Sequence, residues 1–241
     1  MTVFGIMRGM NVAIVFAGGV GTRMGGEIPK QFLPLGGVPI LRRTIEKFIH
    51  ACPEAMIVTV LPKDSMDWWK TYCVEHFSHC PQMLVEGGIT RFHSVRNALE
   101  KIPSGAIVAV HDGVRPLLSE ELIRKMTGRM QTCRALIPVV PMVDTLKLLE
   151  TASDGTLAEI TGSQVDRSKV FGAQTPQLFW SEDLKAAYAQ AYDTAFTDDA
   201  SVARKKEIPL SFIEGEKFNL KITTPEDICL AEAILKIRGE Y

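Results

Sequence analysis

A chain of 241 residues with 46% hydrophobic and 23% charged residues has the length and composition of one ordinary globular domain. Lysine and arginine number 27 against 28 aspartates and glutamates, and this balance excludes the basic excess that nucleic-acid binders usually carry. No apolar run approaches the roughly 18 residues of a membrane span, and residues 1–10 lack the pattern of a secretion signal, so neither nucleic acid nor membrane is an expected partner.

The first half of the chain alternates apolar runs with helical patterns. The run NVAIVF at residues 11–16 is nearly continuous, which is typical of a strand buried on both faces of a parallel sheet. Further strands are predicted at residues 55–61, 82–85 and 107–110. Helices are predicted at residues 40–50, 64–76 and 90–101.

The second half continues this order after one irregular stretch. A strand is predicted at 134–140, and residues 142–170 are interpreted as a two-stranded arm that turns at Ser153-Asp-Gly155. Further elements are predicted at residues 181–190 (helix), 199–206 (helix), 210–213 (strand) and 224–239 (helix, with Thr224 as N-cap and Gly239 as the stop). We therefore expect one α/β domain over residues 1–241, with a Rossmann-like, mostly parallel layered sheet and a projecting β-arm.

The five cysteines form no CxxC pair, and such a scattered odd set suits a reducing cytoplasm. Cys73, His76, His79 and Cys80 have a spacing that zinc ligands can show. We interpret them instead as a helix end with small buried thiols.

A glycine-rich segment, AGGVGTRMGG at residues 17–26, directly follows the first strand. Ligands bind at the carboxyl ends of strands in open parallel sheets, and glycines let backbone N–H groups approach phosphate oxygens. Arg23 and Lys30 lie close enough along the chain to neutralise a triphosphate. A plain tight turn is one alternative. Pro29 and Pro34 weigh against a nicotinamide-binding loop, and the missing Gly-Lys-Ser/Thr weighs against a Walker P-loop.

The segment from residue 18 to residue 31, with its glycines, arginine and Pro-Lys-Gln, resembles the opening of the sugar-phosphate cytidylyltransferases. The resemblance runs in order from about residue 11 to 236. It implies transfer of the cytidylyl group of CTP to a polyol phosphate, with release of pyrophosphate. Methylerythritol phosphate of the non-mevalonate isoprenoid pathway is the expected acceptor, and ribitol 5-phosphate is the alternative, because Gly18 is common in the ribitol enzymes. In the triphosphate loop, the resemblance assigns Ala17, Gly18, Gly19 and Arg23, with Lys30 on the reacting phosphate.

Two later motifs follow predicted strands. In VEGGITRFHS (85–94), the resemblance implies that Gly88 and Ser94 contact cytosine, whereas a simple capped turn is the alternative. In HDGVRP (111–116), Asp112 is the expected ligand of Mg²⁺ in the nucleotide site, and Arg115 has a planar fork suited to the acceptor phosphate. A lone aspartate at a strand end can also be a turn former, and His111 is interpreted as structural.

The remaining assignments come from the resemblance. The arm is expected to clasp a second subunit in a homodimer, so that Thr145 and Arg167 reach the acceptor phosphate across it. Thr197 and Asp198 are expected to contact the acceptor's hydroxyls, although they could simply begin a helix. Lys221, placed in a short strand, is expected on the α-phosphate. Thr175, in QTPQ, is either a substrate contact or part of a turn.

Two other classes remain as alternatives at this point: a dehydrogenase, and a nucleotide sensor that binds CTP without catalysis. Arg23, Lys30 and Lys221 are the predicted catalytic residues, and their presence argues against the sensor because positioned positive charge is what phosphoryl chemistry requires.

Overall fold

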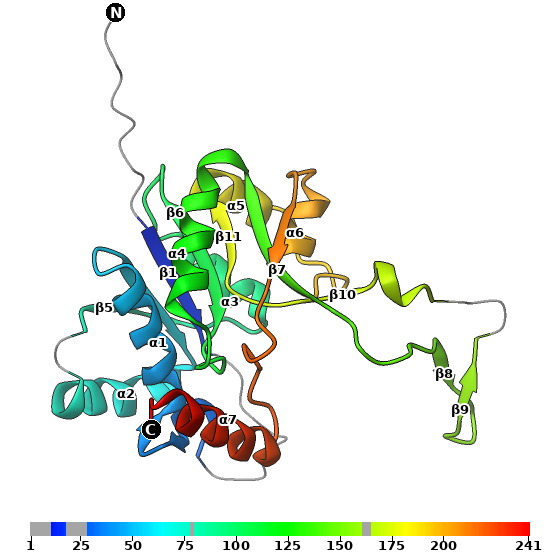
Figure 1. Cartoon of the computed structure of the whole chain (residues 1–241). Helices are drawn as coiled ribbons and strands as arrows, with labels where there is room; N and C mark the ends of the chain where they lie inside the picture. The colour runs from blue at the N-terminus through cyan, green and yellow to red at the C-terminus, as the bar shows by residue number, and fades with distance from the viewer. Residues whose placement is uncertain (1–10, 18–27, 78–79, 161–164) are drawn as a thin grey trace, which may run out of the picture.

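An eight-stranded mixed sheet forms the centre of the computed structural model, which describes residues 11–17, 28–77, 80–160 and 165–241 (Figure 1). Seven strands follow one another in the order β10-β7-β11-β6-β1-β4-β5, and β12 pairs with β7. The strands are β1 (Asn11–Phe16), β4 (Met56–Leu61), β5 (Gln82–Glu86), β6 (Ile107–Asp112), β7 (Ala135–Pro141), β10 (Phe171–Ala173), β11 (Gln177–Trp180) and β12 (Ser211–Glu214).

Most neighbours in the sheet are parallel, as predicted. Strands β1, β4, β5 and β6 pair in parallel, and β12 is parallel to β7. Strand β11 runs antiparallel to both β6 and β7, and β10 is antiparallel to β7. These two antiparallel strands were not predicted from the sequence.

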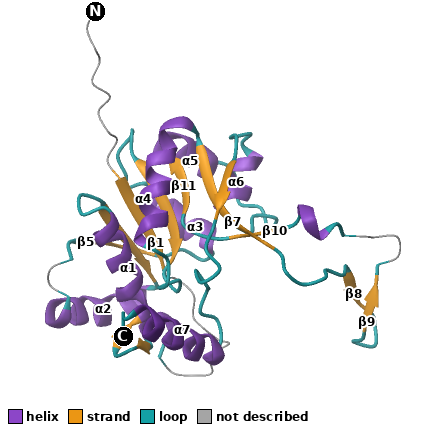
Figure 2. Ribbon diagram, viewed as in Figure 1, coloured by secondary structure: helices purple, strands orange, loops and turns teal. Residues whose placement is uncertain are grey.

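Helices cover both faces of the sheet (Figure 2). On one face, β1 buries Val12 and Ile14 with α3 (Arg91–Leu99), α5 (Ser181–Tyr188) and α6 (Asp199–Lys205). On the other face, Ala13 and Val15 pack with α1 (Ile40–Ala51), α2 (Lys63–His76) and α4 (Glu120–Arg129). This alternation along one strand is what a strand buried on both faces requires. In the described part of the chain, every helix is too short or too polar to span a membrane.

A smaller core lies beneath α7 (Pro225–Arg238) and joins it to the hairpin β2 (Pro34–Leu35) and β3 (Val38–Pro39). The predicted caps of this helix are confirmed. Thr224 and Asp227 form a capping box, and Gly239 adopts a left-handed conformation with φ of 67°. Short 3₁₀ turns occur at Lys30–Phe32, Met130–Thr132 and Arg167–Lys169.

The arm leaves the sheet between β7 and β10 and extends away from the body (Figure 1). It contains the antiparallel pair β8 (Leu149–Thr151) and β9 (Leu157–Glu159), and every residue of both strands is exposed. Gly155 forms the turn between them with φ of 83°, where a glycine is favoured.

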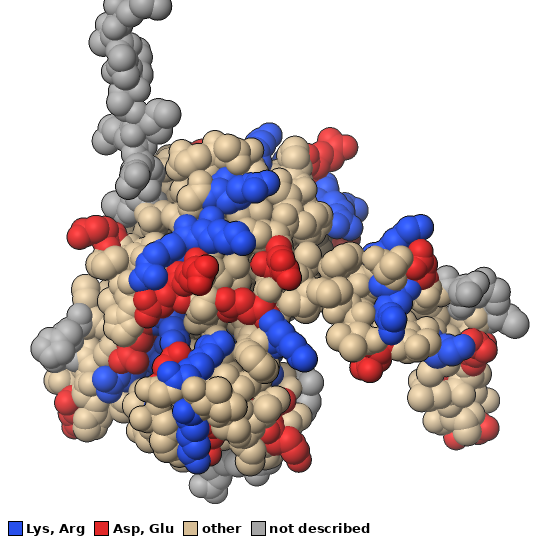
Figure 3. Space-filling model, in the orientation of Figure 1, with Lys and Arg blue, Asp and Glu red and all other residues tan. Residues whose placement is uncertain are grey.

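Charged side chains of both signs are mixed on the face shown in Figure 3, without a field of one sign. This agrees with the near-zero formal charge of −1. A polyanionic ligand would therefore have to be bound by a few placed cations.

Candidate active site

The predicted motifs meet at one edge of the sheet because β1 and β6 are parallel neighbours and end side by side. Phe16 pairs in register with Asp112, and the N–H of Ala17 donates to Val60 O at 2.9 Å. Gln31 is buried and its side chain donates to Ala17 O at 2.9 Å, which fastens the Lys30–Phe32 turn to this edge. Lys30 therefore lies in a turn anchored at the end of β1. Gly18, Gly19 and Arg23 lie outside the described residues.

Asp112, at the end of β6, forms the centre of a charged cluster. Its Oδ2 accepts from Arg115 Nε at 3.1 Å and lies 3.2 Å from Lys221 Nζ. Burial alone would raise the pKa of this carboxyl. The positive charges of Arg91, Lys221 and Arg115 outweigh that effect and hold the pKa well below its ordinary value. Asp112 is therefore a buried, permanently charged carboxylate that faces a half-exposed ammonium group.

Lys221 is not in a strand, contrary to the sequence analysis. The segment before α7 forms no strand. Side-chain hydrogen bonds and a single backbone hydrogen bond fix its position. Arg115 Nη1 donates to Asn219 O at 2.7 Å, Asn219 Nδ2 donates to Thr175 O at 2.8 Å, and Ile222 N donates to Val114 O at 2.9 Å. These bonds place the ammonium group of Lys221 beside Asp112.

His111 has the structural role that the sequence analysis proposed. The hydroxyl of Thr175 accepts from Asp112 N at 3.1 Å and lies 3.0 Å from His111 Nδ1, to which it can donate. This arrangement assigns the ring proton to Nε2, which lies 3.2 Å from Arg115 O. Burial lowers the pKa of His111 to about 4, so the ring is neutral at neutral pH. Thr175 is therefore bonded within the protein at this site.

Gly88 and Ser94 are joined to each other in the turn that leads into α3. Gly88 N donates to Ser94 Oγ at 3.0 Å, and Ser94 Oγ donates to Thr90 O at 2.9 Å. A Cβ on Gly88 would lie 2.5 Å from His93 Cβ, so only glycine fits without a shift. Thr90 is the N-cap of α3, and the capped turn that the sequence analysis weighed as an alternative is present. Contact of Gly88 and Ser94 with cytosine stays a prediction.

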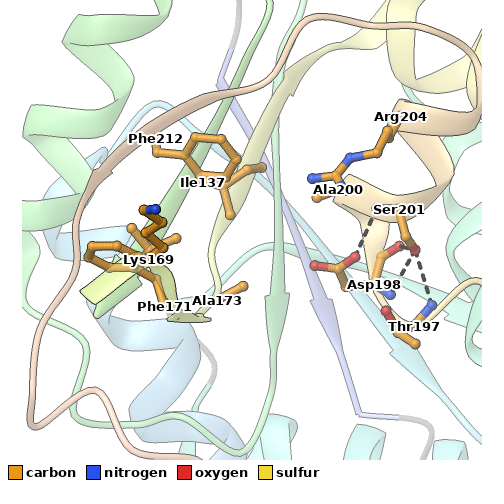
Figure 4. Close-up of a pocket in the computed structure, with 11 residues that line it drawn as sticks. Ile137, Lys169, Phe171, Ala173, Thr197, Asp198, Ala200, Ser201, Arg204 and Phe212 are labelled. Atoms are coloured by element: carbon orange, nitrogen blue, oxygen red, sulfur yellow. Dashed lines mark hydrogen bonds between the residues drawn. The ribbon is translucent and has the colours of Figure 1, made fainter. Parts of the chain in front are cut away.

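Thr197 and Asp198 lie at the beginning of α6. Asp198 is the N-cap, with Oδ1 accepting from Ser201 N at 2.8 Å, and Gln177 Nε2 donates to its Oδ2 at 2.8 Å. Both residues also line a cavity of about 590 Å³ between α6 and the strands β7, β10 and β12 (Figure 4). The helix-start interpretation is therefore correct, and the side of Asp198 that faces the cavity remains a candidate ligand contact.

Thr145 and Arg167 lie on the exposed connections of the arm. Arg167 Nη1 donates to Val143 O at 2.5 Å, which joins the two sides of the arm near its base. Among the contacts of the described residues, none links either side chain to the Asp112 cluster of the same chain. The structure thus brings Asp112, Arg115 and Lys221 together but leaves the two arm residues apart from them.

The sequence raises two metals, zinc at the Cys73–Cys80 segment and Mg²⁺ at Asp112. In the part of the chain that the structure describes, no three histidine, cysteine, aspartate or glutamate residues are grouped for a metal ion, and His79 lies outside that part. Burial raises the pKa of the Cys73 thiol to about 11. For Mg²⁺ the donor set fits: Asp112 offers one charged carboxylate, and this ion typically takes one or two carboxylates together with substrate phosphates.

Three residues at the site were not predicted from the sequence. Asn219 is completely buried and orders the segment that carries Lys221, and Arg91 forms an ion pair with the buried Asp199. For Asn219, the sequence offers no signal beyond the residue type itself. For Arg91, the signal was a cation three residues after the Gly87-Gly88 pair.

The chain is also similar to known proteins along almost its whole length. A sequence model of the family described as IspD, 2-C-methyl-D-erythritol 4-phosphate cytidylyltransferase, matches residues 11–237. The chain is 41% identical over 223 residues to the protein of that name from Bacteroides fragilis, covering 92% of this chain and 98% of the relative. It is 43% identical over 222 residues to the one from Bacteroides thetaiotaomicron, with the same coverage of 92% and 98%.

A solved structure is also similar. The crystal structure of 4-diphosphocytidyl-2C-methyl-D-erythritol synthase from Anaerococcus prevotii superposes with a TM-score of 0.76 at 28% identity. The match covers 95% of this chain and 99% of that chain.

Proposed function

The chain belongs to the 2-C-methyl-D-erythritol 4-phosphate cytidylyltransferase family, and we propose how its site divides the work of that reaction. The enzyme transfers CMP from CTP to 2-C-methyl-D-erythritol 4-phosphate and releases pyrophosphate, a step of isoprenoid precursor synthesis. One observation carries the assignment of roles: the half-exposed Lys221 ammonium lies 3.2 Å from the buried Asp112 carboxylate at the end of β6.

In this proposal, an oxygen of the acceptor phosphate attacks the α-phosphorus of CTP. A new P–O bond forms, the bond to the oxygen that bridges to the β-phosphorus breaks, and pyrophosphate leaves with that oxygen. The attacking phosphate is already an anion, so no general base is required. Lys221, Lys30 and Arg23 stabilise the negative charge of the transition state, and the charged network around Asp112 positions Lys221 beforehand.

Mg²⁺ is the proposed cofactor, with Asp112 as its protein ligand. The ion would neutralise charge on the triphosphate and orient it. The strongly lowered pKa of Asp112 supports this role, because the carboxylate is charged and ready to bind a cation at any physiological pH.

The two substrates are assigned to different loops. The backbone of residues 17–19 and the turn at Gly88 and Ser94 are proposed for CTP, since both segments follow the carboxyl ends of parallel strands, where open sheets of this kind bind ligands. Arg115, Thr197 and Asp198 are proposed for the acceptor. Arg115 already donates to Asp112 and to Asn219 O, so its phosphate contact would use the remaining N–H groups of its fork.

We propose further that the arm works in a homodimer, where Thr145 and Arg167 of one subunit reach the acceptor bound by the other. Two features support this. The arm extends away from the body of its own chain (Figure 1), and it exposes large apolar side chains, with Val143 75% and Leu157 70% exposed. Exposed apolar patches on a projecting hairpin are typical of a protein–protein contact.

An acceptor panel tests the reaction itself. Purified enzyme is mixed with CTP, UTP or GTP and with methylerythritol phosphate or ribitol 5-phosphate, and pyrophosphate release is measured. Release with CTP and methylerythritol phosphate is expected to exceed every other pair. Faster release with ribitol 5-phosphate, or none with any acceptor, would contradict the assignment.

A mixing experiment tests the dimer. Lys221→Met and Arg167→Ala each remove one half of the proposed site. When equal amounts of the two variants are unfolded and refolded together, half of the dimers are mixed and each has one intact site. About a quarter of all sites should then be active. If the arm acts within its own chain, the mixture will be no more active than the average of the two variants.

A further inference from the structure

A bidentate ion pair connects the two loops that are proposed to hold the two substrates. Arg91 is the first residue of α3, after the Gly88 turn, and Asp199 is the first residue of α6, after Asp198. Arg91 Nη1 and Nη2 donate to Asp199 Oδ1 and Oδ2 at 2.9 and 2.5 Å. The hydroxyl of Tyr188 donates to Oδ1 at 2.6 Å, and Asp199 is completely buried. These hydrogen bonds and the burial therefore hold the Asp199 carboxylate in a single orientation.

The same guanidinium also reaches the start of the triphosphate loop. Its central carbon lies 5.7 Å from the centre of the Phe16 ring, within the range of a cation–π contact. Phe16 is the last residue of β1, directly before Ala17, and is the register partner of Asp112. Arg91, at the start of α3, therefore contacts the ends of two other segments, the start of α6 and the end of β1, which carry or directly precede proposed site residues.

The two loops lie side by side without packing solidly. A cavity of about 70 Å³ is lined from one side by Thr90 and Arg91 and from the other by Thr197 and Asp198. Beyond the ion pair, α3 meets this region through rings, with Phe92 and Phe196 stacked 5.6 Å apart. Because a bidentate pair has a fixed geometry, it transmits a displacement better than the rings, which can slide.

We propose that Arg91 and Asp199 are positioning residues that couple CTP binding at residues 87–94 to acceptor binding at residues 197–201. The inference rests on the proposed assignment of these loops and adds that each substrate strengthens the binding of the other. When CTP fixes the Gly88 turn, Arg91 is fixed with it, and the buried carboxylate then holds the start of α6 in place. Coupling of this kind is reciprocal by thermodynamic necessity.

The test measures the coupling directly. Titration calorimetry gives the affinity for a CTP analogue with a methylene group between the α- and β-phosphorus, with Mg²⁺ present, in the absence and presence of saturating methylerythritol phosphate. The ratio of the two affinities is expected to be at least about fivefold in the wild type. In Asp199→Asn, which keeps the size but removes the charge, it should fall below about twofold. Tyr188→Phe should give an intermediate ratio.

A second ion pair of the chain, between α5 and the residue before β7, offers a matched control. Arg134 and Asp183 also form a bidentate ion pair, but Arg134 precedes β7, at the edge opposite the Asp112 cluster. Arg134→Gln should leave the ratio at its wild-type value. A merely structural role of Asp199 would lower the thermal midpoint and leave the ratio unchanged.

The outcomes separate this inference from the proposed function. A wild-type enzyme that releases pyrophosphate but shows no coupling, or an Asp199→Asn variant that keeps the wild-type ratio, overturns the inference alone. If Asp199→Asn does not fold, unchanged ratios in both Tyr188→Phe and Arg91→Lys overturn it. A wild-type enzyme that releases no pyrophosphate overturns the proposed function instead.

Discussion

The proposed site residues lie in two regions that are built in opposite ways. At the end of β6, polar side chains are buried and multiply bonded: Asp112 is 6% exposed and interacts with both Arg115 and Lys221. In the arm, the strands are fully exposed, and its ion pair between Lys147 and Glu159 has side chains that are 63% and 59% exposed. The first region is organised by its own chain. In the arm, the described contacts are exposed and weak, so its proposed part in the reaction depends on the protein surface that packs against it.

The largest expected effect is on kcat, and it distinguishes the end of β6 from the arm. Lys221→Met should lower kcat by about 10²–10³, because it removes a positioned charge from the transition state. The thermal midpoint should fall only modestly, because Arg115 and Arg91 still compensate the buried charge of Asp112. Lys147→Met removes a more exposed lysine, in the arm, and should leave kcat unchanged. Equal kcat values for the two variants, measured by pyrophosphate release, would remove Lys221 from the mechanism.

The second prediction concerns the buried ring of His111. The unfolded chain binds a proton on this residue with a pKa near 6.5, whereas in the folded chain burial lowers the pKa to about 4. The unfolded state therefore binds more protons between these values, and the free energy of unfolding should fall as the pH drops from about 6.5 to about 4. The difference in pKa corresponds to roughly 3 kcal/mol at most.

Urea unfolding of the wild type and of His111→Gln over this pH range checks the prediction. The variant will have lost hydrogen bonds and be less stable at neutral pH, but its stability should depend less on pH. The same slope in both proteins would show that another group titrates.

Gly88→Ala tests the tight turn before α3. The added Cβ would come within 2.5 Å of His93 Cβ and 3.1 Å of the His93 carbonyl carbon, so the backbone must shift. Overpacking of this kind costs about 1–3 kcal/mol, and the KM for CTP should rise because Gly88 is proposed to contact the base. Gly128, in α4, has no atoms within 4 Å of an added Cβ, and Gly128→Ala should be at least as stable as the wild type. Wild-type stability and KM in Gly88→Ala would contradict the geometry of this turn.

The smallest effect is expected in the arm. Glu159→Gln breaks the exposed pair with Lys147 at 3.3 Å and should change the free energy of unfolding by less than about 1 kcal/mol. Urea unfolding measures this directly. A larger loss would mean that the arm is held as firmly as the edge of the sheet, and the contrast between the two regions would fail.

Local patterns allowed much of the fold to be predicted. The apolar run of β1 indicated its burial on both faces, and Thr224 with Asp227 indicated the start of α7, because each of these features depends on neighbours a few residues away. The position of Asp112 at the end of an apolar strand also followed from local sequence. Since parallel strands place their carboxyl ends together, its proximity to the loop after β1 could be inferred as well.

The tertiary structure decided what depends on partners far away in the chain. Strand β11 is four residues long and becomes a strand by pairing between β6 and β7, and Lys221 is positioned without any strand. Arg91 and Asp199 are 108 residues apart, and nothing in the local sequence of either one predicts the other. By itself the sequence determined which chemical groups follow the strand ends, since hydrophobic periodicity and capping act over single turns. Which of those groups touch was settled only by packing, because burying a charge requires a partner wherever in the chain that partner lies.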